Sequence, residues 1–598
     1  MSTKEAKSDA TKAQVPKETQ MTGAEMVIKA LIEQGVEVIF GYPGGAVLPI
    51  YDEIFKNSDK IKHVLVRQEG GALHAAEGYA RSTGKVGCAL VTSGPGATNA
   101  VTGLTDALLD SIPLVCITGQ VPTFLIGTDA FQEADTTGIT RPCTKHNYLV
   151  KSACEVSEKI HEAFHVARSG RPGPVVIDIP KDVQFAKSSY KKNKPLIEQS
   201  YRPATDPDME AIEIAVELMS QSKRPVFYTG GGVINAGKEA SEYLRELVEL
   251  TGFPVTSTLM GLGAFPAKDS KWLGMLGMHG TFEANWAMHD CDVMINVGAR
   301  FDDRVTGRVD KFSPHSKKIH IDIDASSINK NVQVEIPIVA DATKALKAMV
   351  EIWKNRGYKS DKNALDSWWN QIENWRAKKC LSYKNDSKII KPQYALERLR
   401  DAMQADSRDA YVTTEVGQHQ MWAAQFLPFN EPNRWMTSGG LGTMGYGLPA
   451  AIGAQIAHPD ALVVDVAGEA SILMNIQEMS CAVQYKTPVK IFILNNQWMG
   501  MVRQWQELLH GERYSNSYTE SLPDFVKLAE AYGGIGLRAE TPEDLDKVIA
   551  EMMTTDRVTI VDVCVDQKEN CFPMIPSGKA HNEMILSPDA QAFDKSLV

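Results

Sequence analysis

The sequence of 598 residues contains no apolar run of about 18 or more residues, the length that a membrane helix requires. It has no basic excess, because 63 Lys and Arg stand against 74 Asp and Glu for a net charge of −11. Its nine scattered cysteines form no CxxC pair and no zinc-type spacing. We therefore expect no membrane and no nucleic-acid partner, and thiols that stay reduced in the cytoplasm.

What is present is typical of a folded protein, with 43% hydrophobic and 23% charged residues. The length predicts three or four domains of roughly 150 residues each. Residues 1–20 lack the apolar stretch of a signal peptide, and they contain three acidic residues and no Arg, unlike a transit peptide. We expect these residues to form a disordered tail.

Short runs rich in Val and Ile alternate with longer helical stretches. Within almost all of these runs, apolar residues follow one another without alternating polar positions. This is expected for strands of a parallel sheet that helices cover on both faces. Many end in glycine or small polar residues, and ligands bind at the carboxyl ends of such strands. The clearest runs are 87–92, 114–118, 175–179, 226–229, 293–297, 319–323, 462–466, 491–494 and 558–563.

Two polar stretches, 187–208 and 355–392, interrupt this alternation. Both are charged, and the second has helix-like parts around 365–377. We interpret both as interdomain linkers. The first and third of the blocks that they separate both have the pattern of glycine-punctuated, doubly wound α/β units.

The most informative segment joins two predicted strands. The run 462–466 leads into Gly468-Glu469-Ala470-Ser471, and the run 490–494 ends at Asn495-Asn496. An acid and an amide at neighbouring strand ends offer oxygen ligands to Mg²⁺, and small residues before a helix let backbone N–H groups approach a diphosphate. The pattern is similar to the Gly-Asp-Gly to Asn-Asn signature of thiamine-diphosphate enzymes, with Glu469 for Asp and Ala470 for the second Gly. The alternative for this segment alone is an ordinary strand–helix turn.

A thiamine-diphosphate enzyme also needs a carboxylate at the cofactor's aminopyrimidine, which helps to remove the thiazolium C2 proton. Glu69 follows the apolar run 63–66 at a predicted helix start, in a different domain from the metal turn. A Glu at this position is more commonly only a favourable partner for the helix dipole. Together with the metal turn, however, Glu69 becomes the leading candidate.

Nearly the whole chain resembles the catalytic (large) subunits of the acetohydroxyacid synthase, or acetolactate synthase, family. The matching stretches are 41–46, 92–99, 119–122, 129–133, 170–174, 275–280, 298–307, 440–447, 500–505 and 573–585. The resemblance implies an α/β fold of three doubly wound parallel-sheet domains of the thiamine-diphosphate decarboxylase/synthase type. These are 21–186 for the thiamine pyrimidine, 209–354 for FAD and 393–570 for diphosphate and Mg²⁺, followed by a lid or tail at 571–598.

The resemblance also assigns residues to thiamine diphosphate and its metal. Glu69 takes the activating position, and Gln132 and Lys181 join it as catalytic residues that handle substrate. Glu469 and Asn496 bind Mg²⁺ through side chains, and Trp498 binds it through its carbonyl. Core packing is the alternative for Met444. The further cofactor contacts are Pro43, Gly45, Asn99, Val416, Gly417, Gln418, His419, Gly442, Met444, Ala470 and Ser471.

The middle block gives only a weak dinucleotide signal by itself, because its glycines after a strand do not form GxGxxG. The resemblance implies an FAD that does no obligatory redox chemistry and is kept for structural reasons. The residues assigned around it are Arg171, Gly230, Gly231, Gly232, Met278, His279, Gly298, Arg300, Asp302, Arg304, Asp322 and Asp341.

The resemblance assigns the remaining substrate contacts to Phe131, Met278, Arg304, Met501 and Trp505. Arg304 suits the carboxylate of a 2-oxoacid because its guanidinium can bind in a bidentate manner. The alternative is an ordinary ion pair with Asp302 or Asp303. Trp505 would pack on the alkyl group of the acceptor, with core packing as the alternative.

The implied reaction decarboxylates pyruvate on thiamine diphosphate and joins the hydroxyethyl unit to pyruvate or 2-oxobutyrate. The products, 2-acetolactate and 2-aceto-2-hydroxybutyrate, lead to valine, leucine and isoleucine. Glu69 and the metal turn lie in different domains, and members of the family complete their sites across subunits, so we expect a homodimer or homotetramer. The resemblance also implies a small regulatory subunit. The alternatives are another thiamine-diphosphate carboligase or decarboxylase, of the glyoxylate carboligase or sulfoacetaldehyde acetyltransferase type, and a non-catalytic flavin-binding paralogue.

Overall fold

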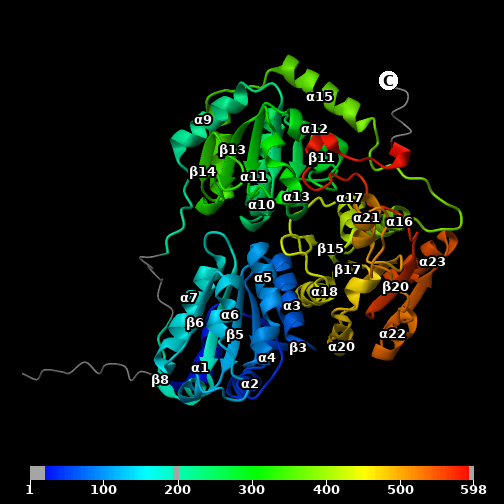
Figure 1. Ribbon diagram of the computed structural model, residues 1–598. Helices are drawn as coiled ribbons and strands as arrows, with labels where there is room; N and C mark the ends of the chain where they lie inside the picture. The colour runs from blue at the N-terminus through cyan, green and yellow to red at the C-terminus, as the bar shows by residue number, and fades with distance from the viewer. Residues whose placement is uncertain (1–19, 193–200, 591–598) are drawn as a thin grey trace, which may run out of the picture.

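The computed structural model describes residues 20–192 and 201–590, which form three α/β units around one six-stranded sheet each (Figure 1). Every strand pair within these three sheets is parallel. The predicted fold class is confirmed. Most of the predicted tail, residues 1–19, lies outside the described residues.

The first unit has the strand order β3-β2-β4-β5-β7-β6. Its strands are β2 (Val38–Gly41), β3 (Lys62–Leu65), β4 (Gly87–Val91), β5 (Leu114–Gln120), β6 (His146–Leu149) and β7 (Pro174–Pro180). Its helices are α1 (Gly23–Glu33), α2 (Leu48–Lys56), α3 (Glu69–Thr83), α4 (Pro95–Asn99), α5 (Val101–Leu109), α6 (Thr136–Thr140), α7 (Val156–Arg168) and α8 (Lys181–Phe185).

The central unit has the strand order β11-β10-β9-β12-β13-β14. Its strands are β9 (Pro225–Thr229), β10 (Val255–Ser257), β11 (Trp272–Met275), β12 (Val293–Val297), β13 (Lys317–Asp322) and β14 (Ile336–Val339). Its helices are α9 (Met209–Ser220), α10 (Gly231–Asn235), α11 (Lys238–Thr251), α12 (Phe282–Asp290), α13 (Asp303–Thr306), α14 (Ala342–Asn355) and α15 (Lys362–Arg376).

The third unit has the strand order β16-β15-β17-β18-β20-β19. Its strands are β15 (Ala410–Thr414), β16 (Trp435–Met436), β17 (Leu462–Ala467), β18 (Lys490–Asn495), β19 (Ile535–Ala539) and β20 (Thr559–Cys564). Its helices are α16 (Pro392–Ala405), α17 (Gln418–Phe426), α18 (Gly447–Ala457), α19 (Glu469–Ile472), α20 (Met479–Gln484), α21 (Gly500–Leu509), α22 (Phe525–Tyr532) and α23 (Pro542–Thr554).

All nine runs predicted as strands are confirmed, as β4, β5, β7, β9, β12, β13, β17, β18 and β20. Their lack of alternation has the predicted cause, because each sheet is covered on both faces. In β18, Ile491 and Ile493 belong to one hydrophobic core, while Phe492 and Leu494 belong to another. Side chains of a strand point alternately to opposite faces, so a strand between two cores is apolar at every position.

The first and third units share a core through α3 and α18. These helices come close because each has a glycine at the contact: a side chain at Gly78 would overlap the carbonyl of Ala450, and one at Gly453 would overlap the carbonyl of Ala75. Such close backbone approach permits only glycine. The two units are therefore held in a fixed relation.

Two short regions differ from the predicted linkers and tail. Strand β1 (Gln20–Thr22) pairs antiparallel with β8 (Lys187–Ser189), so Gln20 belongs to a strand and the start of 187–208 is tied to the first unit. In 355–392, Trp368 and Ile372 of α15 are buried in the core of the central unit, and Trp368 Nε1 donates to the Pro225 carbonyl at 3.0 Å. Helix α15 is thus part of that unit, because its aromatic face needs a core to cover it.

Within the described ranges, no helix combines the length and the apolarity needed to cross a bilayer.

Candidate functional site

A cavity of about 1000 Å³ lies between the central and third units, and residues 109–111, 165 and 168–172 of the first unit also line it. It is lined by residues that follow strands of both sheets: the glycines after β9 and β12, and Val416, Gly468 and Asn496 after β15, β17 and β18. These are carboxyl ends of parallel strands, where α/β proteins bind their ligands. The two sheets thus present their binding edges to one another.

Most of the predicted site residues line this cavity. They are Arg171, Gly230, Gly231, Gly232, Met278, His279, Gly298, Arg300, Asp302, Arg304, Asp322, Asp341, Val416, Gly417, Gln418, His419, Gly442, Met444, Glu469, Ala470, Ser471, Asn496, Trp498, Met501 and Trp505.

The metal turn places a buried acid beside an amide. Glu469 is the first residue of α19 and Asn496 directly follows β18, and their exposed fractions are 1% and 4%. Burial raises the pKa of Glu469 to about 8, although the backbone N–H groups of Asn496 and Trp498 oppose this shift. Among the described residues, Glu469 Oε1 has no hydrogen-bond partner. A buried carboxyl oxygen without a partner, at the end of the strand that pairs with the strand of Asn496, fits a hard divalent cation such as Mg²⁺.

Glycines beside the metal turn let the backbone approach neighbouring side chains closely. A side chain at Gly500 would overlap the Gln418 amide, and one at Gly468 would lie 2.6 Å from His419 Nδ1. Burial lowers the pKa of His419 to about 3, so its ring is neutral. The Ser471 hydroxyl donates to Glu415 Oε2 at 2.8 Å. These small residues at the start of α19 suit a diphosphate held by backbone N–H groups.

The loop that carries Gly442 and Met444 is held from the first unit, by two acids of helix α5 and its end. Asp110 accepts hydrogen bonds from the Gly439 and Gly440 N–H groups at 2.9 and 2.7 Å. Asp106 accepts one from the Thr443 hydroxyl at 3.0 Å. Gly442 itself has φ of +77°, which glycine adopts without strain.

Sequence reasoning missed these acids and Glu415. Glu415 accepts from the Gly445 N–H at 2.6 Å and lies immediately before the predicted loop 416–419, at the end of a strand. That position is a signal that could have identified it. Asp106 and Asp110 lie more than 300 residues from the loop that they hold, and no local pattern indicates that contact.

The central half of the cavity contains a seam of glycines. Gly230 and Gly232 lie so close to Gly298 that a side chain at either position would overlap the backbone there. His279 is buried, with Nδ1 3.0 Å from the Pro573 carbonyl oxygen, and burial lowers its pKa to about 4. Asp341 caps α14 by accepting from the Lys344 N–H at 3.2 Å. The seam and the length of the cavity fit a dinucleotide beside the metal turn.

The remaining charged residues of this half are paired. Arg300 pairs with Asp302, and Arg304 pairs with Asp303 at 3.2 Å. Arg171 of the first unit reaches Asp324 at 3.4 Å. The Arg304 side chain is more than half exposed, so its pair contributes little and leaves the guanidinium available to a ligand.

The other predicted residues form a second group, on the first unit. Glu69 Oε2 accepts from Asn99 Nδ2 at 3.0 Å, and Gln132 lies against the turn at Gly94. Pro43 and Gly45 follow β2, Lys181 begins α8, and Phe131 is 89% exposed. In the described part of the chain, none of these residues lines the cavity between the other two units.

The C-terminal strap, which we define as residues 569–575, lies between the central and third units. Cys571, Met574 and Ile575 are buried, and the Ile575 N–H donates to the Met278 carbonyl at 2.8 Å. The strap therefore joins both sides of the cavity. Whether the segment from 571 onward closes as a lid stays a prediction.

Comparison with known families gives three matches that follow one another along the chain. The N-terminal TPP binding domain of thiamine pyrophosphate enzymes matches residues 21–139, the central domain matches 212–349, and the C-terminal TPP binding domain matches 415–563. Each match falls within one of the three sheet units.

Full-length relatives narrow this assignment. The acetolactate synthase large subunit of Haemophilus influenzae is 50% identical over 571 residues, which cover 95% of this chain and 98% of the relative. The acetolactate synthase isozyme 3 large subunit of Escherichia coli is 50% identical over 572 residues, with 95% and 99% covered. The large subunit of Cyanidium caldarium is 46% identical over 573 residues, with 94% and 96% covered. The chain therefore belongs to the acetolactate synthase large-subunit family of thiamine pyrophosphate enzymes.

Proposed function

We propose that this chain is the catalytic subunit of an acetolactate synthase. It decarboxylates pyruvate and joins the two-carbon unit to pyruvate or 2-oxobutyrate, giving 2-acetolactate or 2-aceto-2-hydroxybutyrate for branched-chain amino acid synthesis. The observation that carries the proposal is the buried, unpartnered Glu469 oxygen beside Asn496, at the edge of a cavity with an open backbone seat. Similarity to large subunits over 95% of the chain supports the choice of reaction.

The residues present fit the three cofactors of the family, which are thiamine diphosphate, Mg²⁺ and FAD. Glu469, Asn496 and the Trp498 carbonyl would hold Mg²⁺, and residues 416–419 with Ala470 and Ser471 would hold the diphosphate. Thiamine diphosphate, when bound, supplies a carbon nucleophile and an electron sink for decarboxylation. The glycine seam of the central unit would hold FAD, in a structural and non-redox role.

The side chains of the protein position protons and substrate. The Glu69 carboxyl would hydrogen-bond the aminopyrimidine N1′ of the cofactor and share a proton with it there, while its bond from Asn99 holds it in place. Arg304 would bind the 2-oxoacid carboxylate, and Gln132 and Lys181 would contact the substrate. Met501 and Trp505, which line the cavity, would pack on the alkyl group of the acceptor and keep water out.

We propose that a second copy of the chain completes the site. The residues of the Glu69 group do not line the cavity of their own chain, so Glu69 of one protomer would face the cavity of its partner. The first unit also exposes large apolar side chains at Phe124, Phe131 and Phe185. Exposed apolar residues of this size are typical of interfaces, and a homodimer or homotetramer would cover them.

Two further assignments extend the proposal. Relatives are called large subunits, which supports a small regulatory subunit as a partner. The nine free cysteines, none paired in the described ranges, support a reducing location such as the cytoplasm.

Product analysis tests the proposed reaction. Purified protein is incubated with pyruvate, with and without 2-oxobutyrate, while Mg²⁺ and thiamine diphosphate are withheld in turn. We expect 2-acetolactate from pyruvate alone, 2-aceto-2-hydroxybutyrate when 2-oxobutyrate is added, and neither product without both cofactors. Acetaldehyde as the sole product would indicate a simple decarboxylase. The absence of any metal-dependent turnover would favour a non-catalytic paralogue.

A further inference from the structure

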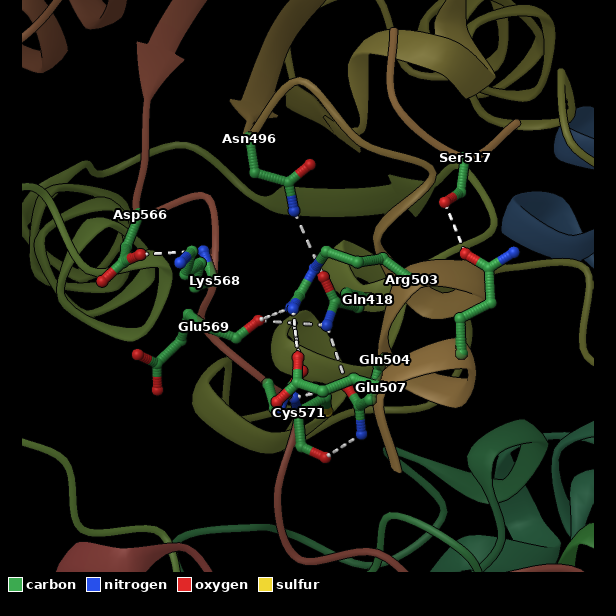
Figure 2. Close-up of polar contacts among 12 residues, drawn as sticks. Gln418, Asn496, Arg503, Gln504, Glu507, Ser517, Asp566, Lys568, Glu569 and Cys571 are labelled. Carbon is green, nitrogen blue, oxygen red and sulfur yellow. Dashed lines mark hydrogen bonds and ion pairs between the residues drawn. The ribbon is translucent and has the colours of Figure 1, made fainter. Parts of the chain in front are cut away.

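Gln504 is a fully buried amide that the predicted site leaves unassigned. It lies on α21, and both of its polar atoms are used (Figure 2). Its Oε1 accepts from Gln418 Nε2 at 2.8 Å and from the Cys571 N–H at 2.7 Å. Its Nε2 donates to the Cys571 carbonyl at 3.0 Å. Gln504 therefore hydrogen-bonds both the N–H group and the carbonyl group of Cys571 in the C-terminal strap.

A second amide continues this network to the metal turn. Gln418 Oε1 accepts from Asn496 Nδ2 at 3.2 Å, and Gln418 Nε2 also donates to the Glu569 carbonyl at 3.2 Å. Figure 2 shows Gln418 between Asn496 and the strap. Three side-chain amides thus connect the strap to a residue of the predicted metal site.

Backbone groups orient the amides of this network, beginning with the N–H of Cys571 beside Gln504. A backbone N–H can only donate, so the atom of Gln504 that faces it must be the oxygen. That oxygen requires a donor from Gln418, which leaves the Gln418 oxygen to face Asn496. Asn496 must then present its nitrogen to Gln418, and its Oδ1 is directed away from Gln418. The Trp498 N–H donates to this Oδ1 at 3.0 Å, so Gln418 and the Trp498 backbone together fix which end of the Asn496 amide is available as a metal ligand.

The other end of the strap is fixed to the central unit. His279 Nδ1 lies 3.0 Å from the Pro573 carbonyl oxygen, and Gln425 Nε2 donates to the Phe572 and His279 carbonyls at 3.1 and 2.9 Å. Because the strap is held on this side too, Gln504 has a fixed partner against which to orient Gln418.

We propose that Gln504 is a positioning residue for the metal site: by anchoring Gln418 to the strap backbone, it holds the amide nitrogen of Asn496 and, together with the Trp498 N–H, keeps the Asn496 oxygen presented to Mg²⁺. The inference rests on the proposed function, because Asn496 is a metal ligand only there. Partners of metal ligands typically change metal affinity by about 10–100-fold when they are removed.

The test measures Mg²⁺ affinity of the full-length protein in saturating thiamine diphosphate, followed by tryptophan fluorescence, since Trp498 adjoins the metal turn. Gln504→Met keeps the volume of the side chain but removes both polar atoms. We expect its Mg²⁺ dissociation constant to rise about 10–100-fold, and trypsin to cleave the C-terminal segment faster. Gln504→Asn keeps an amide that is one methylene too short to span Gln418 and Cys571, so it should weaken Mg²⁺ in the same direction. It decides the question if the Met variant does not fold.

Arg503→Met provides the matched control. Arg503 is the neighbouring buried residue and also holds the strap, with Nη2 2.8 Å from the Glu569 carbonyl oxygen and from Asn570 Oδ1. It shares that carbonyl with Gln418, but within the described residues no hydrogen bond joins its side chain to Gln418 or Gln504, whose own contacts it leaves in place. Its loss should speed cleavage while Mg²⁺ affinity stays within about twofold of the parent.

Three outcomes separate the inference from its foundation. Unchanged Mg²⁺ affinity in the folded Gln504 variants would overturn the role of Gln504. Equal weakening by Arg503→Met would also overturn it, because anchoring of the strap alone would then explain the effect. If the parent itself gave no response to Mg²⁺ with thiamine diphosphate, the proposed function would fail, and the inference with it.

Discussion

The two groups of candidate site residues differ in how much of their geometry one chain supplies. In the cavity between the central and third units, Glu469, Asn496 and His419 are buried, and burial shifts the pKa values of Glu469 and His419. On the first unit, Phe131 is almost fully exposed and Gln132 is exposed beside it. Buried polar groups must be hydrogen-bonded by their neighbours. Exposed polar groups can still acquire such partners when another molecule covers them.

This difference in burial explains why the residues of the cavity are fully oriented within one chain and those of the Glu69 group are not. The cavity residues are oriented within the chain, by Glu415 and Gln418 from one side and by Asp110 from another. The Glu69 group has a bond from Asn99 but lies outside the cavity. We infer that association of two chains joins a rigid half-site to an open one. Four predictions test this comparison.

The largest effect should come from Glu69→Gln. The variant keeps the size of the side chain and its hydrogen-bonding capacity but cannot take up a proton. Loss of a general acid–base group typically costs about 10²–10⁴-fold in rate, so we expect acetolactate formation to fall by that factor, measured on cofactor-saturated enzyme. Binding of Mg²⁺ should be unchanged, because Glu69 is not one of the proposed metal ligands. Equal rates for variant and parent would remove Glu69 from the mechanism.

The second prediction tests whether the two groups meet between chains. Glu69→Gln and Glu469→Gln copies are co-expressed with different tags, and dimers that contain one of each are purified over both. One of the two sites in such a dimer has both groups intact, so we expect about half of the parental activity per dimer from two nearly inactive variants. Homodimers of each variant serve as controls. No recovery in the mixed dimer would mean that each chain builds its own site.

The sequence predicts the parts of this arrangement that depend on local pattern. Apolar runs predict the nine strands, because a strand that is buried on both faces is apolar at nearly every position. The metal turn is equally readable, because Glu469 and Asn496 directly follow such runs. Local pattern cannot reveal partners chosen by tertiary packing. In the sequence, nothing distinguishes Asp110 from an ordinary acid at the end of a helix, or Gln504 from the other glutamines.

The same limit applies to the linkers. Residues 362–376 are polar enough to suggest a connection between domains, and their Trp residues were the contrary signal, since Trp368 is buried against the central sheet. The residues assigned from family resemblance, such as Lys181 and Asp341, stay predictions of function. In Asp341 the structure adds a role as a helix cap, which is compatible with a ligand contact on its free oxygen.

The third prediction concerns Asp110, through which the first unit holds the loop of Gly442. Asp110→Asn keeps one acceptor oxygen and loses the other, and a hydrogen bond to a charged group is worth about 1.5–3 kcal/mol. We expect about a tenfold loss of activity at limiting thiamine diphosphate. Asp52→Asn, on an exposed helix of the same unit, should have no effect. Full activity in the Asp110 variant would show that the loop keeps its position without this acid.

The pH dependence of stability sharpens this prediction. Burial and the nearby Asp106 raise the pKa of Asp110 to about 7, above its ordinary value near 3.8. Between these two values the folded state binds more protons than the unfolded state, so stability falls as the pH rises from about 4 to about 7 and levels off above. The Asp110→Asn variant lacks this pH-dependent contribution to the free energy of unfolding. Its melting temperature relative to the parent should therefore improve between pH 5 and pH 8, and a constant difference would contradict the assignment.

The smallest effect should come from Trp505, which changes selectivity more than rate. Trp505 lines the cavity near Met501, where we expect the alkyl group of the acceptor. One methylene in an apolar pocket is worth about 1–3 kcal/mol, so Trp505→Leu should reduce the preference for 2-oxobutyrate over pyruvate by about fivefold. The ratio of the two products in a competition assay measures this. Leu509→Ala, one turn further along α21 and exposed, is the control.

Because Trp505 belongs to the cavity and not to the Glu69 group, its effect should be the same in every active site, including the single intact site of the mixed dimer. A selectivity that differed between parental and mixed dimers would mean that the acceptor pocket, too, is built by both chains.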